Sequence, residues 1–126
     1  YGLGIGCKKG KTFEEVNAFI KEHLTCDMEE LFGIASIDLK AREEGIWEFA
    51  QYYHLPFETF SAECLNSVEG EFTKSEFVQG ITGVDNVCER AALCLAGSGG
   101  TLALKKTADQ GMTMALSKRK IRLLFE

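Results

Sequence analysis

Lysines and glycines gather near the start of the chain, where a short apolar stretch gives way to a helix-forming one. Lys8, Lys9 and Lys11 flank Gly10, and Thr12 is typical of a helix N-cap. Because a helix N-terminus presents free backbone N–H groups, it favours anions, and nearby lysines strengthen that preference. The chemistry predicted here is binding of a phosphate or a carboxylate.

A phosphate-binding loop is the first alternative for this segment, and its spacing fails. Such a loop needs four residues between its two glycines. Counted back from Gly10, Gly4 is one residue too far and Gly6 is one residue too close. A nucleotide-binding protein is therefore a remote alternative, and a glycine-rich turn before a capped helix explains the pattern better. Ordinary solvated lysines are an equally simple reading of the lysine cluster.

Two carboxylates and one thiol are candidates for acid–base or nucleophilic chemistry. Glu63 closely follows Ser61, a predicted helix N-cap, and Glu89 lies on a predicted helix that is otherwise poor in charge. Ordinary exposed carboxylates are the simpler interpretation of both. Cys7 follows the first predicted strand, but the sequence places neither histidine as its partner.

The remaining cysteines and histidines predict neither a metal site nor disulfides. His23 and Cys26 have the spacing of half a metal site, without two further ligands in the sequence. The five cysteines are scattered without a CxxC pair, and an oxidised set of five would leave one unpaired. Reduced thiols in a cytoplasmic protein are the simpler interpretation.

The elements that must position these residues alternate between strand and helix. In order we predict a strand (1–6), a helix (13–24), a strand (33–37), a helix (46–53), a strand (56–60), a short helix from about Ser75, a buried helix (84–96) and two final strands (101–104 and 112–116). This order of elements, together with strands made of consecutive apolar residues, predicts an α/β fold. We expect three α/β/α layers, with a mainly parallel sheet of about five strands and a C-terminal hairpin.

In such a sheet, ligands bind beyond the carboxyl ends of the strands. The loops predicted there are 7–11, 38–43, 61–63 and 105–111. Lys40 and Lys105 lie in these loops, so we expect them on the same edge as the first lysine cluster. A concentration of lysines on one edge would attract an anionic ligand.

Size and charge limit the remaining possibilities. The chain has 126 residues, enough for one domain, and 45% of them are hydrophobic. Its net charge of −5 argues against nonspecific nucleic-acid binding. The longest stretch without a charged residue, 91–104, is too short to span a membrane.

Six segments, taken in order, carry a family resemblance. They are Gly4-Ile5-Gly6-Cys7-Lys8-Lys9-Gly10, Ala35-Ser36-Ile37-Asp38-Leu39-Lys40-Ala41, Phe60-Ser61-Ala62-Glu63, Ser75-Glu76-Phe77-Val78, Gly83-Val84 with 87–93, and the hairpin 102–116. Through them the chain resembles the C-terminal domain of the cobalamin-biosynthesis protein CbiG and its stand-alone relative CobE. The resemblance implies a single domain, 1–126, excised from a longer chain with an N-terminal domain.

The resemblance also implies an activity, in the anaerobic, cobalt-early route to the corrin ring. Proteins like CbiG act as hydrolases on cobalt-precorrin-5A: they open its δ-lactone and release acetaldehyde, which gives cobalt-precorrin-5B. No resident cofactor is implied, because the substrate carries the cobalt. The implied partners are the corrinoid intermediate, the N-terminal domain and other corrin-pathway enzymes. A non-catalytic corrinoid carrier resembling CobE is the alternative.

The implied substrate is a polyanion, because its ring bears acetate and propionate arms. It would account for a lysine-lined edge on an acidic protein, with glycines that let the backbone approach. Glu63 is then the first candidate for the general base and Glu89 the second. The expected substrate-binding residues are Gly4, Gly6, Cys7, Lys8, Lys9, Gly10, Lys11, Asp38, Lys40, Ser61 and Lys105.

Overall fold

The computed structural model describes residues 1–7, 10–38, 43–68, 86–97 and 99–119. The strands are β1 (Gly2–Cys7), β2 (Gly33–Ile37), β3 (Phe57–Phe60), β4 (Thr101–Asp109) and β5 (Met112–Lys118). The helices are α1 (Phe13–His23), α2 (Glu44–Tyr52), α3 (Ala62–Asn66) and α5 (Val87–Ala96), with a 3₁₀ turn at Met28–Glu30. The predicted α/β class, five strands and C-terminal hairpin are confirmed.

The five strands form one mixed sheet in the order β3-β2-β1-β5-β4. β1, β2 and β3 pair in parallel, whereas β5 pairs antiparallel with both β1 and β4. Parallel pairing therefore joins only three strands, and the sheet is less parallel than predicted. The apolar residues of β5 are buried because this strand lies inside the sheet and not at its edge.

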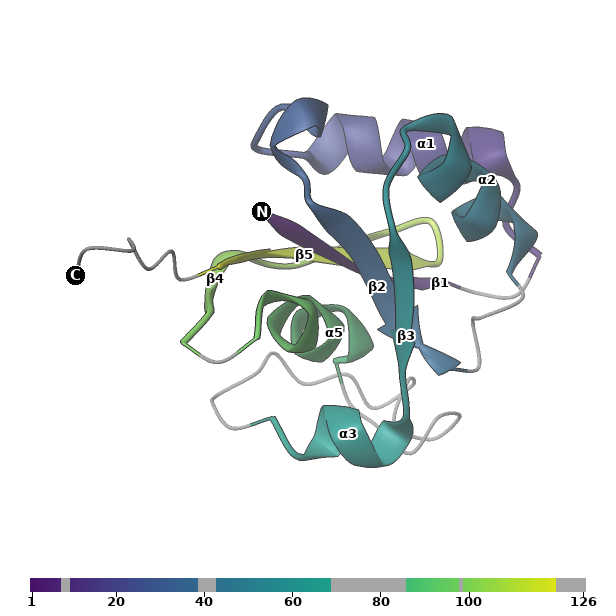
Figure 1. The fold of residues 1–126 in the computed structure, drawn as a ribbon. Helices are drawn as coiled ribbons and strands as arrows, with labels where there is room; N and C mark the ends of the chain where they lie inside the picture. Colours follow the sequence, from purple (N-terminus) through teal and green to yellow (C-terminus); the bar gives the residue numbers. More distant parts are fainter. Residues whose placement is uncertain (8–9, 39–42, 69–85, 98, 120–126) are drawn as a thin grey trace.

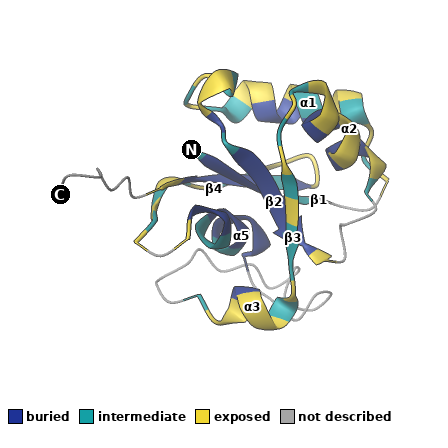
Figure 2. Cartoon of the chain, in the orientation of Figure 1, coloured by how far each residue is buried: buried dark blue, intermediate teal, exposed yellow. Residues whose placement is uncertain are grey.

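Helices cover both faces of the sheet, as the three-layer prediction requires. Figure 1 shows α1 and α2 over one face and α5 with α3 over the other. Leu3, Ile5 and Phe49 are fully buried in the core under α1 and α2, whereas Ile37 and Leu65 pack with α5. Each such side chain contributes about 2 kcal/mol of burial free energy. Figure 2 shows that β1, β2 and α5 form the buried centre.

The predicted helix caps are confirmed. Thr12 and Glu15 form a capping box at α1, in which the Glu15 backbone N–H donates to Thr12 Oγ1 at 3.2 Å. Ser61 Oγ accepts from the Cys64 backbone N–H at 3.1 Å and starts α3. Together these bonds satisfy donors that the first turn of each helix leaves free.

The predicted strand 101–104 and the turn that follows it differ from the structure. β4 continues through Lys105 to Asp109, so Lys105 lies within a strand and not in the loop predicted at 105–111. The turn is confined to Gln110 and Gly111, which have φ of 50° and 79°. The described part of the predicted helix 84–96 is Val87–Ala96, and the short helix expected from Ser75 lies outside the described residues. No helix of the described chain has the length and apolar character of a membrane span.

Candidate functional site

Three parallel strands end at one edge of the sheet, which we call the carboxyl rim. Its described residues are Gly10–Thr12 after β1, Asp38 after β2 and Ser61–Glu63 after β3. The β4–β5 turn reaches the same edge, because Cys7 at the end of β1 pairs with Met112. The fold therefore brings the described parts of three predicted loops and the β4–β5 turn to one edge, as expected, whereas Lys105 lies away from this edge, within β4. Lys8, Lys9, Lys40 and the side chain of Cys7 lie outside the described structure.

Helix α5 also directs its N-terminus toward this rim. A Cβ on Gly2 would lie 3.2 Å from Leu95, near the end of α5, whereas one on Gly4 would meet Cys88, near its start. The helix therefore runs against the direction of β1, and its first turn lies toward the end of that strand. A helix N-terminus at this place favours an anionic ligand.

Gly4 in β1 allows close packing of α5. A Cβ on Gly4 would lie 1.9 Å from the carbonyl oxygen of Cys88 and 2.7 Å from the nitrogen of Ala92. Gly4 is buried under α5, so the structure gives it a packing function instead of the predicted ligand contact. A Cβ on Gly6 would lie 2.8 Å from Thr113 Oγ1, which is a side-chain contact within the sheet.

Glu89 is buried, with only 1% of its surface exposed, contrary to the simpler reading of an exposed carboxylate. Its Oε1 accepts from Asn86 Nδ2 at 2.5 Å, and its Oε2 accepts from the Lys106 backbone N–H at 2.6 Å. Both oxygens are thus engaged in holding the protein together. This arrangement supports a positioning role for Glu89 better than activation of a water molecule.

Asn86 is the N-cap of α5 and is not among the residues predicted from the sequence. It adopts a left-handed backbone conformation with φ of 51°, which asparagine tolerates better than most residues. Its Oδ1 accepts from the Glu89 backbone N–H at 3.1 Å and from Cys88 Sγ at 3.3 Å. Asn86 and Glu89 have the spacing of a capping box, and this pattern in the sequence indicates a helix that starts at Asn86.

The rim is acidic where α1 and α2 meet. A cavity of about 420 Å³ lies there, lined by Gly10, Lys11, Thr12, Phe13, Glu14, Glu43, Glu44, Gly45 and Glu48. Glu43 Oε1 accepts from the Gly10 backbone N–H at 2.7 Å, and Lys11 Nζ lies 3.3 Å from Glu15 Oε2. The Thr12 backbone hydrogen bond and Lys11 lower the pKa of Glu15. A polyanion is therefore better received on the side of the rim toward α3 and α5.

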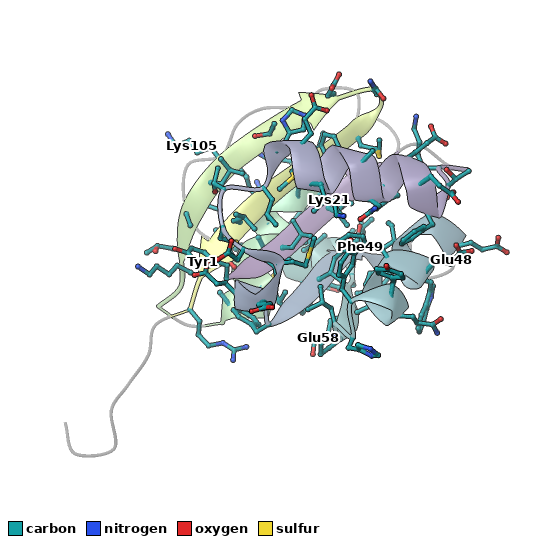
Figure 3. The ribbon with its side chains drawn as sticks, turned by 90° about the horizontal axis from the view of Figure 1, so that it is seen from above. Tyr1, Lys21, Glu48, Phe49, Glu58 and Lys105 are labelled. Carbon is teal, nitrogen blue, oxygen red and sulfur yellow. The ribbon has the colours of Figure 1, made fainter. Side chains whose placement is uncertain are left out.

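The other predicted site residues are not gathered around one point. Asp38, Ser61 and Glu63 are exposed on the rim, and Glu63 lies in the first turn of α3. Lys105 is exposed at the margin of the sheet, where Figure 3 shows it projecting from β4. Among the described residues, none of the predicted site residues joins a cluster of three metal-ligating side chains.

Comparison with known proteins gives consistent matches. The family model described as "Cobalamin synthesis G C-terminus" matches residues 1–117. The chain is 34% identical to the cobalt-precorrin-5A hydrolase of Salmonella typhimurium, covering 90% of this chain and 32% of that protein. It is 32% identical to protein CobE of Sinorhizobium sp, covering 91% of this chain and 77% of that protein.

A solved structure agrees with these sequence matches. The crystal structure of CobE, from the cobalamin biosynthetic pathway, superposes with a TM-score of 0.83 at 31% identity. The superposition covers 92% of this chain and 87% of that one. By contrast, the chain spans about a third of the length of the cobalt-precorrin-5A hydrolases that it matches.

Proposed function

The chain belongs to the cobalamin synthesis G C-terminus family and has a role in cobalamin biosynthesis, and from this we propose that it binds a cobalt-precorrin at its carboxyl rim. We further propose that it serves cobalt-precorrin-5A hydrolysis, in which the δ-lactone opens and acetaldehyde leaves. The observation that carries the proposal is the family match over residues 1–117. The fold agrees with it, because it brings the N-termini of helices to one edge of the sheet. We place this function in the cytoplasm, where reduced thiols are usual.

The rim supports recognition of a ring with carboxylate arms. The first turn of α5 lies at this edge, on the side away from α2, and the positive end of its helix dipole attracts anions. Lys8, Lys9 and Lys40 belong to the same loops in the sequence and would add positive charge. The glutamate-lined cavity between α1 and α2 would repel such arms, so we place the ring on the other side.

Lactone hydrolysis needs an activated water, a stabilised oxyanion and a proton for the leaving oxygen. Glu63 remains our candidate for the general base, because its carboxylate is exposed on the rim at the start of α3. Glu89 instead holds the first turn of α5 against β4, so we assign it a positioning role. The cobalt belongs to the substrate in this proposal.

Binding is tested by titrating the 126-residue chain with cobalt-precorrin-5A and following the visible spectrum of the corrinoid. Replacing Lys8 and Lys9 together with Ala should weaken binding about tenfold or more, because two cations are lost from the segment that follows β1 in the sequence. The matched control replaces Lys21 and Lys118, two exposed lysines on α1 and β5. Both variants lose two charges, so equal weakening in both would contradict the placement of the ligand.

Catalysis is tested separately by assaying acetaldehyde release. Glu63→Gln should reduce release by roughly 100-fold or more while corrinoid binding is retained, because the general base is lost. Glu58→Gln, an exposed carboxylate on β3, is the matched control and should retain activity. Equal activity in the two variants would remove Glu63 from the mechanism.

A non-catalytic corrinoid carrier is the second candidate, favoured by the match to CobE. CobE is 32% identical, and this chain covers 77% of it, compared with 32% of the Salmonella hydrolase. A carrier would change the corrinoid spectrum on binding and release no acetaldehyde, alone or with an added N-terminal domain. The hydrolase proposal requires acetaldehyde in at least one of those two conditions.

A further inference from the structure

A histidine and two carboxylates converge where the end of α1 meets the end of β4. His23 Nε2 lies 3.7 Å from Asp109 Oδ2 and 4.0 Å from Glu22 Oε2. One ligand atom from each of the three residues lies within 4.8 Å of the other two. Residues far apart in the sequence are therefore brought together by the fold, and none of them belongs to the predicted binding set.

The nitrogen at the centre of this cluster has no hydrogen bond. His23 Nε2 is buried from solvent and has no hydrogen-bond partner among the described residues. Both neighbouring carboxylate oxygens are too far away for a hydrogen bond, which requires about 3.2 Å or less. A buried ring nitrogen without a partner is costly, so a group placed between these atoms would be stabilised.

The spacing suits a divalent transition metal ion. Bonds of about 2.1 Å at a tetrahedral angle place neighbouring ligand atoms roughly 3.4 Å apart. The observed 3.7 and 4.0 Å need only small rotations of Asp109 and Glu22, whose side chains are 43% and 66% exposed. The ring of Phe19 lies 5.0 Å from the His23 ring, at 58°, and helps to hold the imidazole in place.

We propose that Glu22, His23 and Asp109 form a binding site for a divalent transition metal such as Zn²⁺, with solvent completing its coordination. Imidazole and carboxylate are ligands that Zn²⁺ accepts, and one histidine with two carboxylates leaves a position open to water. The ion would join the end of α1 to the β4–β5 hairpin beside the carboxyl rim. The site is independent of the corrinoid function proposed above.

Zn²⁺ titration of the purified chain by calorimetry, together with imidazole ¹⁵N NMR, tests this site. One Zn²⁺ should bind per chain and shift the ring nitrogens of His23. Asp109→Asn and Glu22→Gln change exposed side chains without altering their size, and each should weaken binding about tenfold or more. His23→Gln should abolish the binding detected by calorimetry.

The chain offers a matched control, because it contains only one other histidine. His54 is exposed and has φ of 56°, so His54→Asn removes an imidazole at a position where asparagine is tolerated. This variant should bind Zn²⁺ as the wild type does. Unchanged affinity in Asp109→Asn and Glu22→Gln, or His23 ring nitrogen signals that Zn²⁺ leaves unshifted, would overturn the proposal. Circular dichroism of each variant separates loss of the site from loss of the fold.

Discussion

The Glu89 carboxylate links the first turn of α5 to the middle of β4, where its Oε2 accepts from the Lys106 backbone N–H at 2.6 Å. The pairing of β4 with β5 is irregular here, with a register shift between Leu104 and Thr107. Lys106 therefore sits in an interrupted part of the ladder, and Glu89 supplies an acceptor for its N–H group. The buried carboxylate and the irregular strand depend on each other.

Removing this carboxylate should destabilise the fold. Glu89→Ala leaves the Lys106 N–H and the Asn86 side chain without this partner, and should lower the free energy of unfolding by about 3 kcal/mol. Glu89→Gln should cost less, because its amide oxygen still accepts one of the bonds. Urea denaturation measures both changes. The control Glu58→Ala, at an exposed position of β3, should change stability by under about 0.5 kcal/mol, and an equal loss there would refute the prediction.

The contact of β1 with α5 predicts that Gly4 tolerates no side chain. A Cβ at this position would lie 1.9 Å from a backbone oxygen of α5, which cannot move without the helix. Gly4→Ala should therefore lower the free energy of unfolding by about 3 kcal/mol or more. Gly10→Ala is the comparison, because its Cβ meets nothing within 4 Å and only its φ of 89° is unfavourable. That change should cost about 1 kcal/mol, and similar losses at both positions would contradict the close contact.

The thiol of Cys88 should make stability depend on alkaline pH. Burial raises its pKa from 9.0 to about 12 in the folded protein. Well below pH 9 the thiol is protonated in both the folded and the unfolded state, so its full contribution to the free energy of unfolding is present. As pH rises from 9 toward 12, the unfolded state loses the proton first and stability falls. The fall approaches about 1.4 kcal/mol per pH unit.

Cys88→Ala isolates this effect from the other groups that titrate at high pH. The variant should differ from the wild type by a constant amount near neutral pH, which reflects lost packing. Its stability should then fall less steeply than that of the wild type above about pH 9. Urea denaturation across this range provides the comparison, and parallel curves would show that Cys88 does not contribute.

A single hydrogen bond should help to hold α2 against α1. Tyr53 Oη donates to Asn17 Oδ1 at 2.7 Å, in a partly buried position. Tyr53→Phe removes only this hydroxyl and should cost about 1 kcal/mol in thermal or urea unfolding. The adjacent Tyr52 is 65% exposed, so Tyr52→Phe should leave stability unchanged. If both variants unfold like the wild type, the bond contributes nothing measurable.

Local patterns predicted most of the elements, because they depend on nearby residues. Thr12 and Ser61 start helices whose caps need only the next three residues, and the apolar run at 33–37 is a fully buried strand. The sheet order could not be predicted in the same way. It depends on β5 pairing with β1, and in that pairing Gly2 lies opposite Ser117, at the other end of the chain.

The site was predicted less completely than the fold, for a related reason. Strand ends identified the carboxyl rim correctly, but no local pattern shows which side chains another element covers. The sequence pattern therefore predicts a ligand contact for Gly4, which α5 covers, and an exposed carboxylate for Glu89, which bonds to β4. The lysine contacts and the role of Glu63 remain predictions.

The irregular pairing of β4 also affects how the protein behaves at high concentration. β4 is an edge strand, and a regular edge offers unpaired backbone groups to which a second chain can add. The shift between Leu104 and Thr107 bends this edge, and Lys105 places a charge on it. The same distortion that gives Glu89 its partner therefore protects the protein against edge-to-edge aggregation.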